Sequence, residues 1–496
     1  MVREARALTA AFFSVRPVWS RDSQRLVYVS NREGPYRAFS SRWMELALPS
    51  DRLDLSEDVA SCADITPDNL SVILRVFDPQ AQHWQLRRID VVTMVRSTFA
   101  SIDGADLGRP IFSEDARDQV LLPAFDAHTG NTSFFVQRPI GAPSRAAGEC
   151  AGRCEFVDVA RNGSHAIARC MGSDASASFI ELEVHAGSTT RIDLEPAIGT
   201  ITAAAYDRDD RTLLIAASTE KEGACIFQRD PATSAIHPVR CFAGATRIRS
   251  LHASSRTRVV VAAVDTTLRT ELRLLRGTNL KQSKVVQLPA GVGTIERIAS
   301  DGKVVTFTWE TPTTPPDLYD LDTTSGRPRK LRLDVRPTLA LFEEMAVREV
   351  ASNTEDGTIV YAPEGTFEAG ARKRPVVLLV RRDGKVPRLG WSLLVRWLVA
   401  RGLAVVEPVT VTAPSIERAA AWAAEQPWAM AGKVGIVGTA EVVQVAAQRL
   451  EAAQTVVVVI DSAELDRSEE PGEQAEALAR IGALLEGGLG VVGLAR

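Results

Sequence analysis

Histidine is scarce in this sequence, with six residues, and long apolar runs are absent. No histidine follows His252, so the remainder of the chain offers no imidazole as a general base. No apolar run approaches the roughly 18 to 20 residues of a membrane-spanning helix. The formal net charge is only −4, which gives no reason to expect binding to nucleic acid or to an anionic membrane.

Cysteine is also scarce, and its spacing is not typical of a metal site. The six cysteines are Cys62, Cys150, Cys154, Cys170, Cys225 and Cys241. Only the C-x3-C pair at 150 and 154 is close, with no second pair or histidine at zinc-like spacing. We therefore expect no metal and no cofactor, and mostly buried, reduced thiols; a Cys150–Cys154 disulfide is the alternative for an exported protein.

The N-terminus resembles an export signal only weakly. A short apolar run at 7–15 follows Arg3 and Arg6, but Glu4 interrupts the basic region and no A-x-A site follows. We therefore expect a cytoplasmic protein, with export as the minor alternative.

A unit of apolar residues, a polar turn and a β-branched run recurs along the first two thirds of the chain. Its turn position falls at Asp22, Asp68, Asp115, Asn162, Asp209, Arg256 and Asp301. Asp and Asn suit this position because they hydrogen-bond the backbone that follows them. A period in the forties with several short strands per unit is typical of β-propeller blades. We predict a lead-in over 1–16 and a seven-bladed propeller over 17–338.

The pattern changes near residue 340. Strands expected at 375–380, 403–407, 433–437 and 455–460 alternate with helices expected at 391–400, 414–425, 440–453 and 473–485. A strand pair at 348–350 and 358–361 precedes them. Continuous apolar strands alternating with helices indicate a mostly parallel sheet covered on both faces. The predicted fold is therefore an all-β propeller followed by an α/β domain over 339–496.

The strand at 433–437 leads into a segment resembling the G-x-S-x-G nucleophile elbow of α/β-hydrolases. Gly438 holds the first glycine position, but Ala440 stands at the serine position and Val442 at the second glycine position. A serine–histidine–aspartate device needs a hydroxyl and an imidazole. This elbow has neither, so we expect no catalytic residues there.

Seven blades followed by this α/β pattern resemble the prolyl oligopeptidase (S9) family of serine peptidases. The acylaminoacyl-peptidase-like and dipeptidyl-peptidase-like branches are the more similar ones, and the W-S-x-D turn at 19–22 resembles TolB-type blades. The apolar strand at 374–380 and the segments at 400–408 and 434–438 match the family in order and spacing. The resemblance covers the chain from about residue 17.

The functional positions depart from the family. Arg381 and Arg382 begin the loop where the family has His-Gly-Gly-Pro, which helps to form the oxyanion site. Family catalytic domains continue for about another hundred residues to their Asp and His, which indicates a degenerate and truncated hydrolase domain here.

Several other residues are weaker candidates. Glu441 and Asp461 follow adjacent expected strands and could form a carboxylate pair, although solvated strand-end acids are more common. Arg381 and Arg382 belong to a basic cluster that could hold an acidic group or form a solvated tether. Ser392 lies in a superficial G-x-S pattern, and a helix N-terminal serine is the plainer interpretation. The tryptophans Trp43, Trp84 and Trp309 could mark a binding face or pack within blades.

Two hypotheses of different classes follow. In the first, a catalytically inactive member of the group binds a protein or peptide partner through its propeller. The apolar segment at 488–494 would then form an edge strand for a homodimer. In the second, the chain is a serine-type hydrolase with a rebuilt or partner-completed site. A TolB-like periplasmic propeller is a third possibility, and it would require an export signal.

Overall fold

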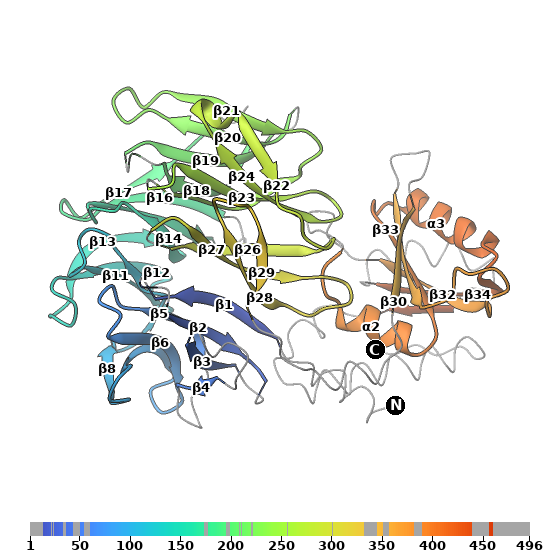
Figure 1. Cartoon of the computed structure of the whole chain (residues 1–496), viewed down its shortest axis with the longest axis horizontal. Helices are drawn as coiled ribbons and strands as arrows, with labels where there is room; N and C mark the ends of the chain where they lie inside the picture. Colours follow the sequence, from blue (N-terminus) through green and yellow to red (C-terminus); the bar gives the residue numbers. More distant parts are fainter. Residues whose placement is uncertain are drawn as a thin grey trace.

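The structure is a computed structural model of the 496-residue chain. It describes residues 13–331, apart from 21, 23, 33–35, 43–49, 54–59, 173–176, 195–198, 208, 210, 220–221, 255 and 300. It further describes residues 345–350, 357–380, 389–438 and 456–459. In Figure 1 these residues form two bodies, a large ring of sheets and a smaller sheet with two helices.

The large body is a seven-bladed β-propeller, because its strands form seven successive antiparallel sheets. Blade one contains β1 (Ser14–Trp19), β2 (Arg25–Ser30), β3 (Arg37–Arg42) and β4 (Asp51–Arg52). Blade two contains β5 (Ala60–Ile65), β6 (Ser71–Asp78), β7 (His83–Asp90) and β8 (Arg96–Ala100). Blade three contains β9 (Ala105–Leu107), β10 (Ile111–Phe112), β11 (Val120–Asp126), β12 (Asn131–Gln137) and β13 (Arg145–Ala151). Blades four and five contain β14 (Arg153–Val159), β15 (His165–Met171), β16 (Ala177–Glu183), β17 (Ser188–Ile192); and β18 (Thr200–Tyr206), β19 (Leu213–Thr219), β20 (Gly223–Arg229), β21 (Ile236–Phe242). Blades six and seven contain β22 (Arg247–Ser254), β23 (Val259–Asp265), β24 (Thr270–Arg276), β25 (Gln282–Val285); and β26 (Val292–Ile298), β27 (Val304–Glu310), β28 (Asp317–Asp322), β29 (Pro328–Lys330). The short helix η2 (Thr278–Leu280) lies within blade six.

The repeated turn lies between the first and second strands of each blade, or between β10 and β11 in blade three, as the sequence pattern predicts. At five of its seven positions a side-chain oxygen accepts the backbone N–H two residues later. The pairs are Asp22 with Gln24, Asp68 with Leu70, Asn162 with Ser164, Asp209 with Arg211 and Asp301 with Lys303. These bonds reverse the chain without help from other blades, which explains why the period is so regular.

The ring closes by packing between the first and last blades. Each blade is built from consecutive strands, so none of the described strands from one end of the propeller completes a sheet at the other. Instead one apolar cluster joins Trp19, Tyr28 and Phe39 of blade one to Leu318 and Leu331 at blade seven. The Ser14 N–H also donates to the Pro316 carbonyl over 3.1 Å. The strand β1 begins at Ser14, three residues before the predicted start of the propeller.

The smaller body is a six-stranded mixed sheet in the order β30-β31-β33-β32-β34-β35. Its strands are β30 (Met345–Val350), β31 (Thr358–Pro363), β32 (Arg374–Val380), β33 (Ala404–Pro408), β34 (Ala429–Gly438) and β35 (Val456–Val459). The four strands β33, β32, β34 and β35 pair in parallel, whereas β30 and β31 are antiparallel. The strands predicted for this region are all present.

Two helices cover opposite faces of this sheet. Helix α2 (Leu393–Ala400) packs in one apolar cluster with Val377 and Leu379 of β32, and α3 (Ala413–Glu425) packs in another with Val376 and Leu378. Successive side chains of a strand point to opposite faces, so both faces are buried and the strand is apolar throughout. The helices predicted at 440–453 and 473–485 lie outside the described residues.

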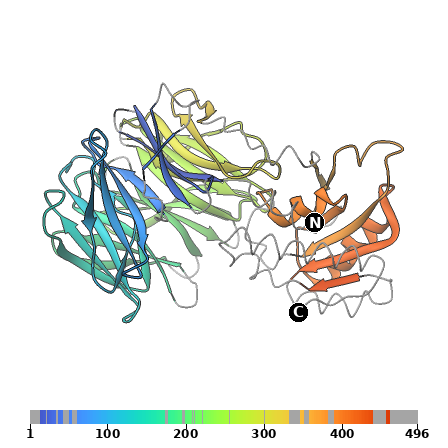
Figure 2. The ribbon, with the colours of Figure 1, turned by 90° about the horizontal axis from the view of Figure 1, so that it is seen from below.

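The two bodies meet at blade six. Leu268, between β23 and β24, packs against the α2 side of the sheet, and its carbonyl accepts the Leu389 N–H over 2.8 Å. Figures 1 and 2 show the bodies side by side. None of the helices among the described residues is both long and apolar enough to cross a membrane.

Candidate functional site

A cavity lies where the first strands of the blades converge. Its volume is about 140 Å³, and its lining comes from blades two to seven. Ten ionisable side chains line it: Asp64, Arg109, Glu114, Asp158, Arg161, Tyr206, Asp207, His252, Glu296 and Arg297. We call this the axial cavity. Its charged lining is unusual, because ionisable groups are mostly exposed unless they are paired.

One repeated strand position supplies four of these groups. The residue four places before each repeated turn is Val18, Asp64, Ile111, Asp158, Ala205, His252 or Arg297. The ring therefore brings together residues that are far apart in sequence. The sequence analysis missed them because it examined the turns alone. The available signal was an ionisable residue at one fixed offset from the turn in four of the seven blades.

Ion pairs hold the lining across the ring. Arg297 of β26 donates to Asp64 of β5 over 2.5 Å. Arg109 lies 3.8 Å from Asp64 and 3.9 Å from Glu296. Asp64 is only 4% exposed, so these guanidinium groups compensate a carboxylate that water hardly reaches.

The cavity changes the proton affinity of two lining groups. Burial lowers the pKa of His252 from 6.5 to about 4, and the positive charges of Arg109 and Arg297 contribute to the shift. Burial raises the pKa of the Glu296 carboxyl, although Arg109 opposes the shift. Both changes favour the neutral form of the group. His252 is therefore an uncharged imidazole near neutral pH.

A second polar network joins blades four and five at the cavity wall. An Asp158 carboxylate oxygen accepts the Tyr206 N–H over 2.8 Å, and the Tyr206 hydroxyl donates to Glu181 over 3.1 Å. Arg229 forms an ion pair with the same Glu181. Burial, followed by the charge of Glu181, raises the pKa of Tyr206 well above 10. Tyr206 is thus a neutral hydrogen-bond donor held in one orientation.

Size and charge limit what the axial cavity can hold. At about 140 Å³ it is smaller than the roughly 300–1,000 Å³ of typical small-molecule pockets. Five carboxyl groups face three guanidinium groups in the lining. The cavity is suited to one polar group of a larger partner, and its charge favours a cation.

The predicted elbow lies only partly within the described residues. The strand β34 ends at Gly438, which is buried and pairs with Val380 of β32 and Val459 of β35. Six further predicted site residues lie outside the described part of the chain: Arg381, Arg382, Ala440, Glu441, Val442 and Asp461. The C-terminal ends of the parallel strands β32, β34 and β35 do lie at one edge of the sheet, as the sequence predicts.

The structure assigns ordinary roles to two of the other candidates. Ser392 caps α2, where its side chain accepts the Val395 N–H over 3.3 Å. Trp309 is 2% exposed, and its indole donates to the Pro289 carbonyl. Trp84 is partly buried, with the Arg75 guanidinium 4.2 Å from its ring centre. Trp43 and the edge segment at 488–494 lie outside the described residues.

Five of the six cysteines form two groups, which corrects the expectation of mostly buried, reduced thiols. Cys154 lies opposite Cys170 in β14 and β15, and Cys225 lies opposite Cys241 in β20 and β21. The structure joins each of these cross-strand pairs, and it also joins Cys154 to Cys150. The sequence analysis considered only Cys150–Cys154, because opposite positions in a hairpin depend on strand register rather than on short spacing. Among the described residues, Cys150–Cys154–Cys170 and Glu222–Cys225–Cys241 are the groups with ligand atoms close enough to hold a metal ion.

Comparison with solved structures identifies several proteins of similar fold. The chain is similar to a prolyl endopeptidase, with a TM-score of 0.66 at 12% identity over 98% of this chain and 79% of that one. It is similar to the acylaminoacyl peptidase of Pyrococcus horikoshii, with a TM-score of 0.67 at 12% identity over 92% and 78%. It is also similar to puromycin hydrolase, with a TM-score of 0.66 at 14% identity over 97% and 84%.

These likenesses show a shared fold. The chain matches no family model, and it matches no curated protein sequence. At 12–14% identity the fold has been retained while most side chains differ, so activity has to be argued from the residues themselves.

Proposed function

We propose that this protein is a peptidase-like scaffold without serine-peptidase chemistry, and that its propeller binds a peptide or protein partner. The smaller sheet would be the degenerate counterpart of an α/β-hydrolase domain. The axial cavity would receive a cationic side chain of the partner, such as that of a lysine.

The absence of serine chemistry is supported by the sequence after β34. In the peptidase family that the chain resembles, the nucleophile lies two residues beyond the first glycine of the elbow. Here that glycine is Gly438, at the buried end of the strand, and the residue two places on is Ala440. Alanine has no hydroxyl group, so it cannot form an acyl-enzyme intermediate. Ser392, the other serine considered, caps a helix.

The binding role rests on one observation, the gathering of ionisable side chains from six blades around the axial cavity. Burying charged groups is costly unless the arrangement compensates them or serves a function. The lining has more carboxyl groups than guanidinium groups, which favours a positively charged group.

Binding of short peptides tests this proposal. The probes are fluorescent tetrapeptides that carry either one lysine or, in the matched control, one norleucine, and anisotropy measures binding. The proposal predicts binding of the lysine peptide and a weaker affinity in Asp207→Asn, which removes a carboxyl group from the lining. The control variant Asp193→Asn alters a carboxylate that is 65% exposed on blade four, and it should bind as the wild type does. Equal binding of the two peptides, or binding of neither, would contradict the proposal.

Homodimerisation through the sheet edge is a second, separate proposal. Among the described strands β35 lies at the edge of the mixed sheet, and an unpaired edge can pair with another chain. Light scattering after size exclusion should show a dimer at high concentration. A strict monomer would contradict this proposal and would leave the peptide-binding proposal unaffected.

Cytoplasmic location is likewise a proposal. The cross-strand cysteine pairs favour the alternative, export, because disulfides persist mainly in oxidising compartments. Fractionation of cells that produce the full-length protein distinguishes the two locations.

A further inference from the structure

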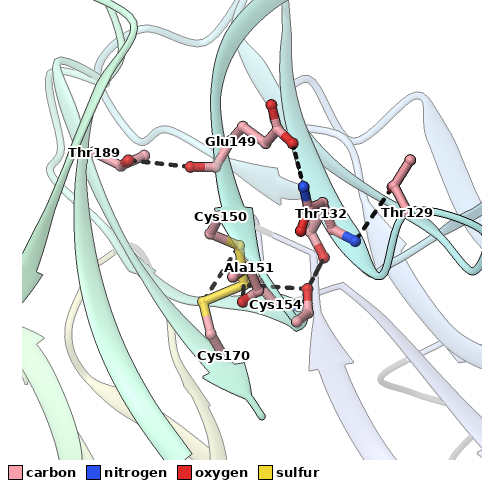
Figure 3. Close-up of a disulfide and its surroundings, with 10 residues drawn as sticks. Thr129, Thr132, Glu149, Cys150, Ala151, Cys154, Cys170 and Thr189 are labelled. Carbon is pink, nitrogen blue, oxygen red and sulfur yellow. Dashed lines mark hydrogen bonds between the residues drawn. A yellow bond between two sulfur atoms is a disulfide. The ribbon is translucent and has the colours of Figure 1, made fainter. Parts of the chain in front are cut away.

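Three cysteines meet where blade three passes into blade four. Cys150 lies in β13, Cys154 in β14 and Cys170 in β15. Figure 3 shows their sulfur atoms converging on one point. The structure joins Cys154 both to Cys150 and to Cys170, and the Cys150 and Cys170 sulfur atoms are 3.4 Å apart. One sulfur atom forms one disulfide at a time, so Cys154 has two alternative partners.

Backbone geometry does not select one of these partners. The Cα–Cα separation is 7.0 Å for Cys150–Cys154 and 3.9 Å for Cys154–Cys170. These values lie on either side of the roughly 4.4–6.8 Å that is usual for disulfides. The short connection between β13 and β14 keeps Cys150 near its partner. There the Thr132 hydroxyl donates to the Gly152 carbonyl and accepts the Cys154 N–H.

Exposure distinguishes the three sulfur atoms. Cys150 is partly exposed, whereas Cys154 and Cys170 are each 2% exposed. A reagent in solution therefore reaches Cys150 first. A disulfide formed at Cys150 can then be transferred to the buried cysteines by thiol–disulfide exchange, because the sulfur atoms of Cys154 and Cys170 lie within contact distance.

Cys225 and Cys241 provide an internal comparison. They too lie opposite each other in neighbouring strands, with a sequence separation of 16 residues and a Cα–Cα separation of 4.0 Å. The third member of their group is the Glu222 carboxylate, 3.0 Å from the Cys241 sulfur. A carboxylate cannot take over a disulfide bond, so within this group of described residues the pair has no alternative partner.

We propose that Cys150, Cys154 and Cys170 form a thiol–disulfide exchange site that reacts with low-molecular-weight disulfides. Cys150 reacts first with the external disulfide, Cys154 then forms a disulfide with Cys150, and Cys170 finally displaces Cys150 to form the buried Cys154–Cys170 disulfide. This inference does not depend on the proposed binding function.

The reaction is balanced without any further reagent. The Cys150 thiolate attacks an external disulfide, forms a mixed disulfide with one half and releases the other half as a thiolate. The Cys154 thiolate attacks the Cys150 sulfur and releases the second external thiolate. The Cys170 thiolate then attacks the Cys154 sulfur and releases Cys150 as a thiolate. In total one external disulfide is reduced to two thiols, and two protein thiols are oxidised to one buried disulfide.

Tryptic mapping can follow each step, because cleavage at arginine places each cysteine in its own peptide. Cys150 falls in 146–153, Cys154 in 154–161 and Cys170 in 170–191. The comparison pair falls in 222–229 and 241–247. Reduced full-length protein is mixed with oxidised glutathione, quenched with acid and alkylating agent at intervals, digested and examined by mass spectrometry.

The proposal predicts an order of products. Glutathione appears first on 146–153, the linked pair 146–153 with 154–161 follows, and the pair 154–161 with 170–191 accumulates last. Cys170→Ser should stop at the second product. Cys150→Ser should slow the final bond on the order of tenfold or more, because a buried sulfur must then react first.

Three results would overturn the proposal. One is glutathione appearing first on 154–161 or 170–191. Another is an unpaired Cys154 in Cys170→Ser protein whose circular dichroism matches that of the wild type. The third is a stoichiometric metal ion in the reduced protein that protects all three cysteines from oxidation, which would identify the cluster as a metal site. In each experiment the linked pair of 222–229 and 241–247 shows that the oxidation conditions were adequate.

Discussion

Arg297 of the seventh blade and Asp64 of the second lie 2.5 Å apart, although 233 residues separate them in sequence. Blade one lies between their blades in the ring. Asp64 is almost fully buried, whereas Arg297 is 30% exposed. This ion pair therefore links the two ends of the propeller, and it is also part of the axial cavity.

Replacing Arg297 should destabilise the fold. In Arg297→Met, Asp64 retains Arg109 at 3.8 Å but loses its shorter partner, so we expect a loss of about 2–4 kcal/mol. The control Arg191→Met removes a pair with both side chains more than 60% exposed and should cost less than about 1 kcal/mol. Urea unfolding measures both, and equal losses would contradict the role given to Asp64.

The pH dependence of stability should reveal His252. Its folded pKa of about 4 lies below its ordinary 6.5, so the unfolded chain binds the extra proton first. Stability should therefore fall as the pH drops from 6.5 to 4, by up to roughly 3 kcal/mol.

Glu296 acts with the opposite sign, because its raised pKa makes the folded state take up a proton first as the pH falls towards 4.5. The comparison should therefore use Glu296→Gln with and without His252→Gln. Urea unfolding at a series of pH values should show the loss between pH 6.5 and 4 only where His252 is present. Parallel curves would show that His252 is not held neutral by the fold.

An acceptor side chain at the sixth repeated turn should stabilise the folded protein. Arg256 occupies the position where five other blades use a side-chain oxygen to accept a backbone N–H. Arg256→Asp should raise stability by about 0.5–1.5 kcal/mol at neutral pH. Thermal unfolding of Arg256→Asp and of Arg256→Ala distinguishes the effect of the new acceptor from the effect of losing the arginine. An equal change of stability in the two variants would contradict the role given to the acceptor.

Gly152 should be intolerant of a side chain. Its φ is +83°, and a Cβ would collide with the Met171 carbonyl oxygen. We expect Gly152→Ala to cost about 2–4 kcal/mol. Gly104 has a similar φ of +73° with open space around it, so Gly104→Ala should cost only about 1–2 kcal/mol. Urea unfolding under reducing conditions measures both losses of unfolding free energy without a contribution from disulfides. Equal losses in the two variants would contradict the predicted clash at Gly152.

The propeller could be predicted from sequence because its signals are local. Each turn is set by an Asp or Asn that bonds the backbone two residues on, as Asp68 and Asp301 do. The apolar run at 375–380 indicated a strand buried on both faces, and β32 has that environment.

The axial cavity could not be predicted from local sequence signals in the same way. Asp64, His252 and Arg297 meet only when the ring closes, and closure depends on packing between the first and last blades. The cysteine cluster had a similar difficulty. That Cys154 faces Cys170 depends on the register of one hairpin, which the spacing of cysteines does not reveal.

Labelling with a fluorophosphonate probe tests the central claim most directly. The purified, folded protein is incubated with the probe beside an unfolded sample, and hydrolysis of aminoacyl-arylamides is measured in parallel. The account predicts no labelling beyond that of the unfolded control and no turnover, because Ala440 stands where the proposed resemblance places the nucleophile. Specific labelling of one serine together with turnover would show an activated nucleophile, and it would establish the protein as a serine hydrolase with a rebuilt site.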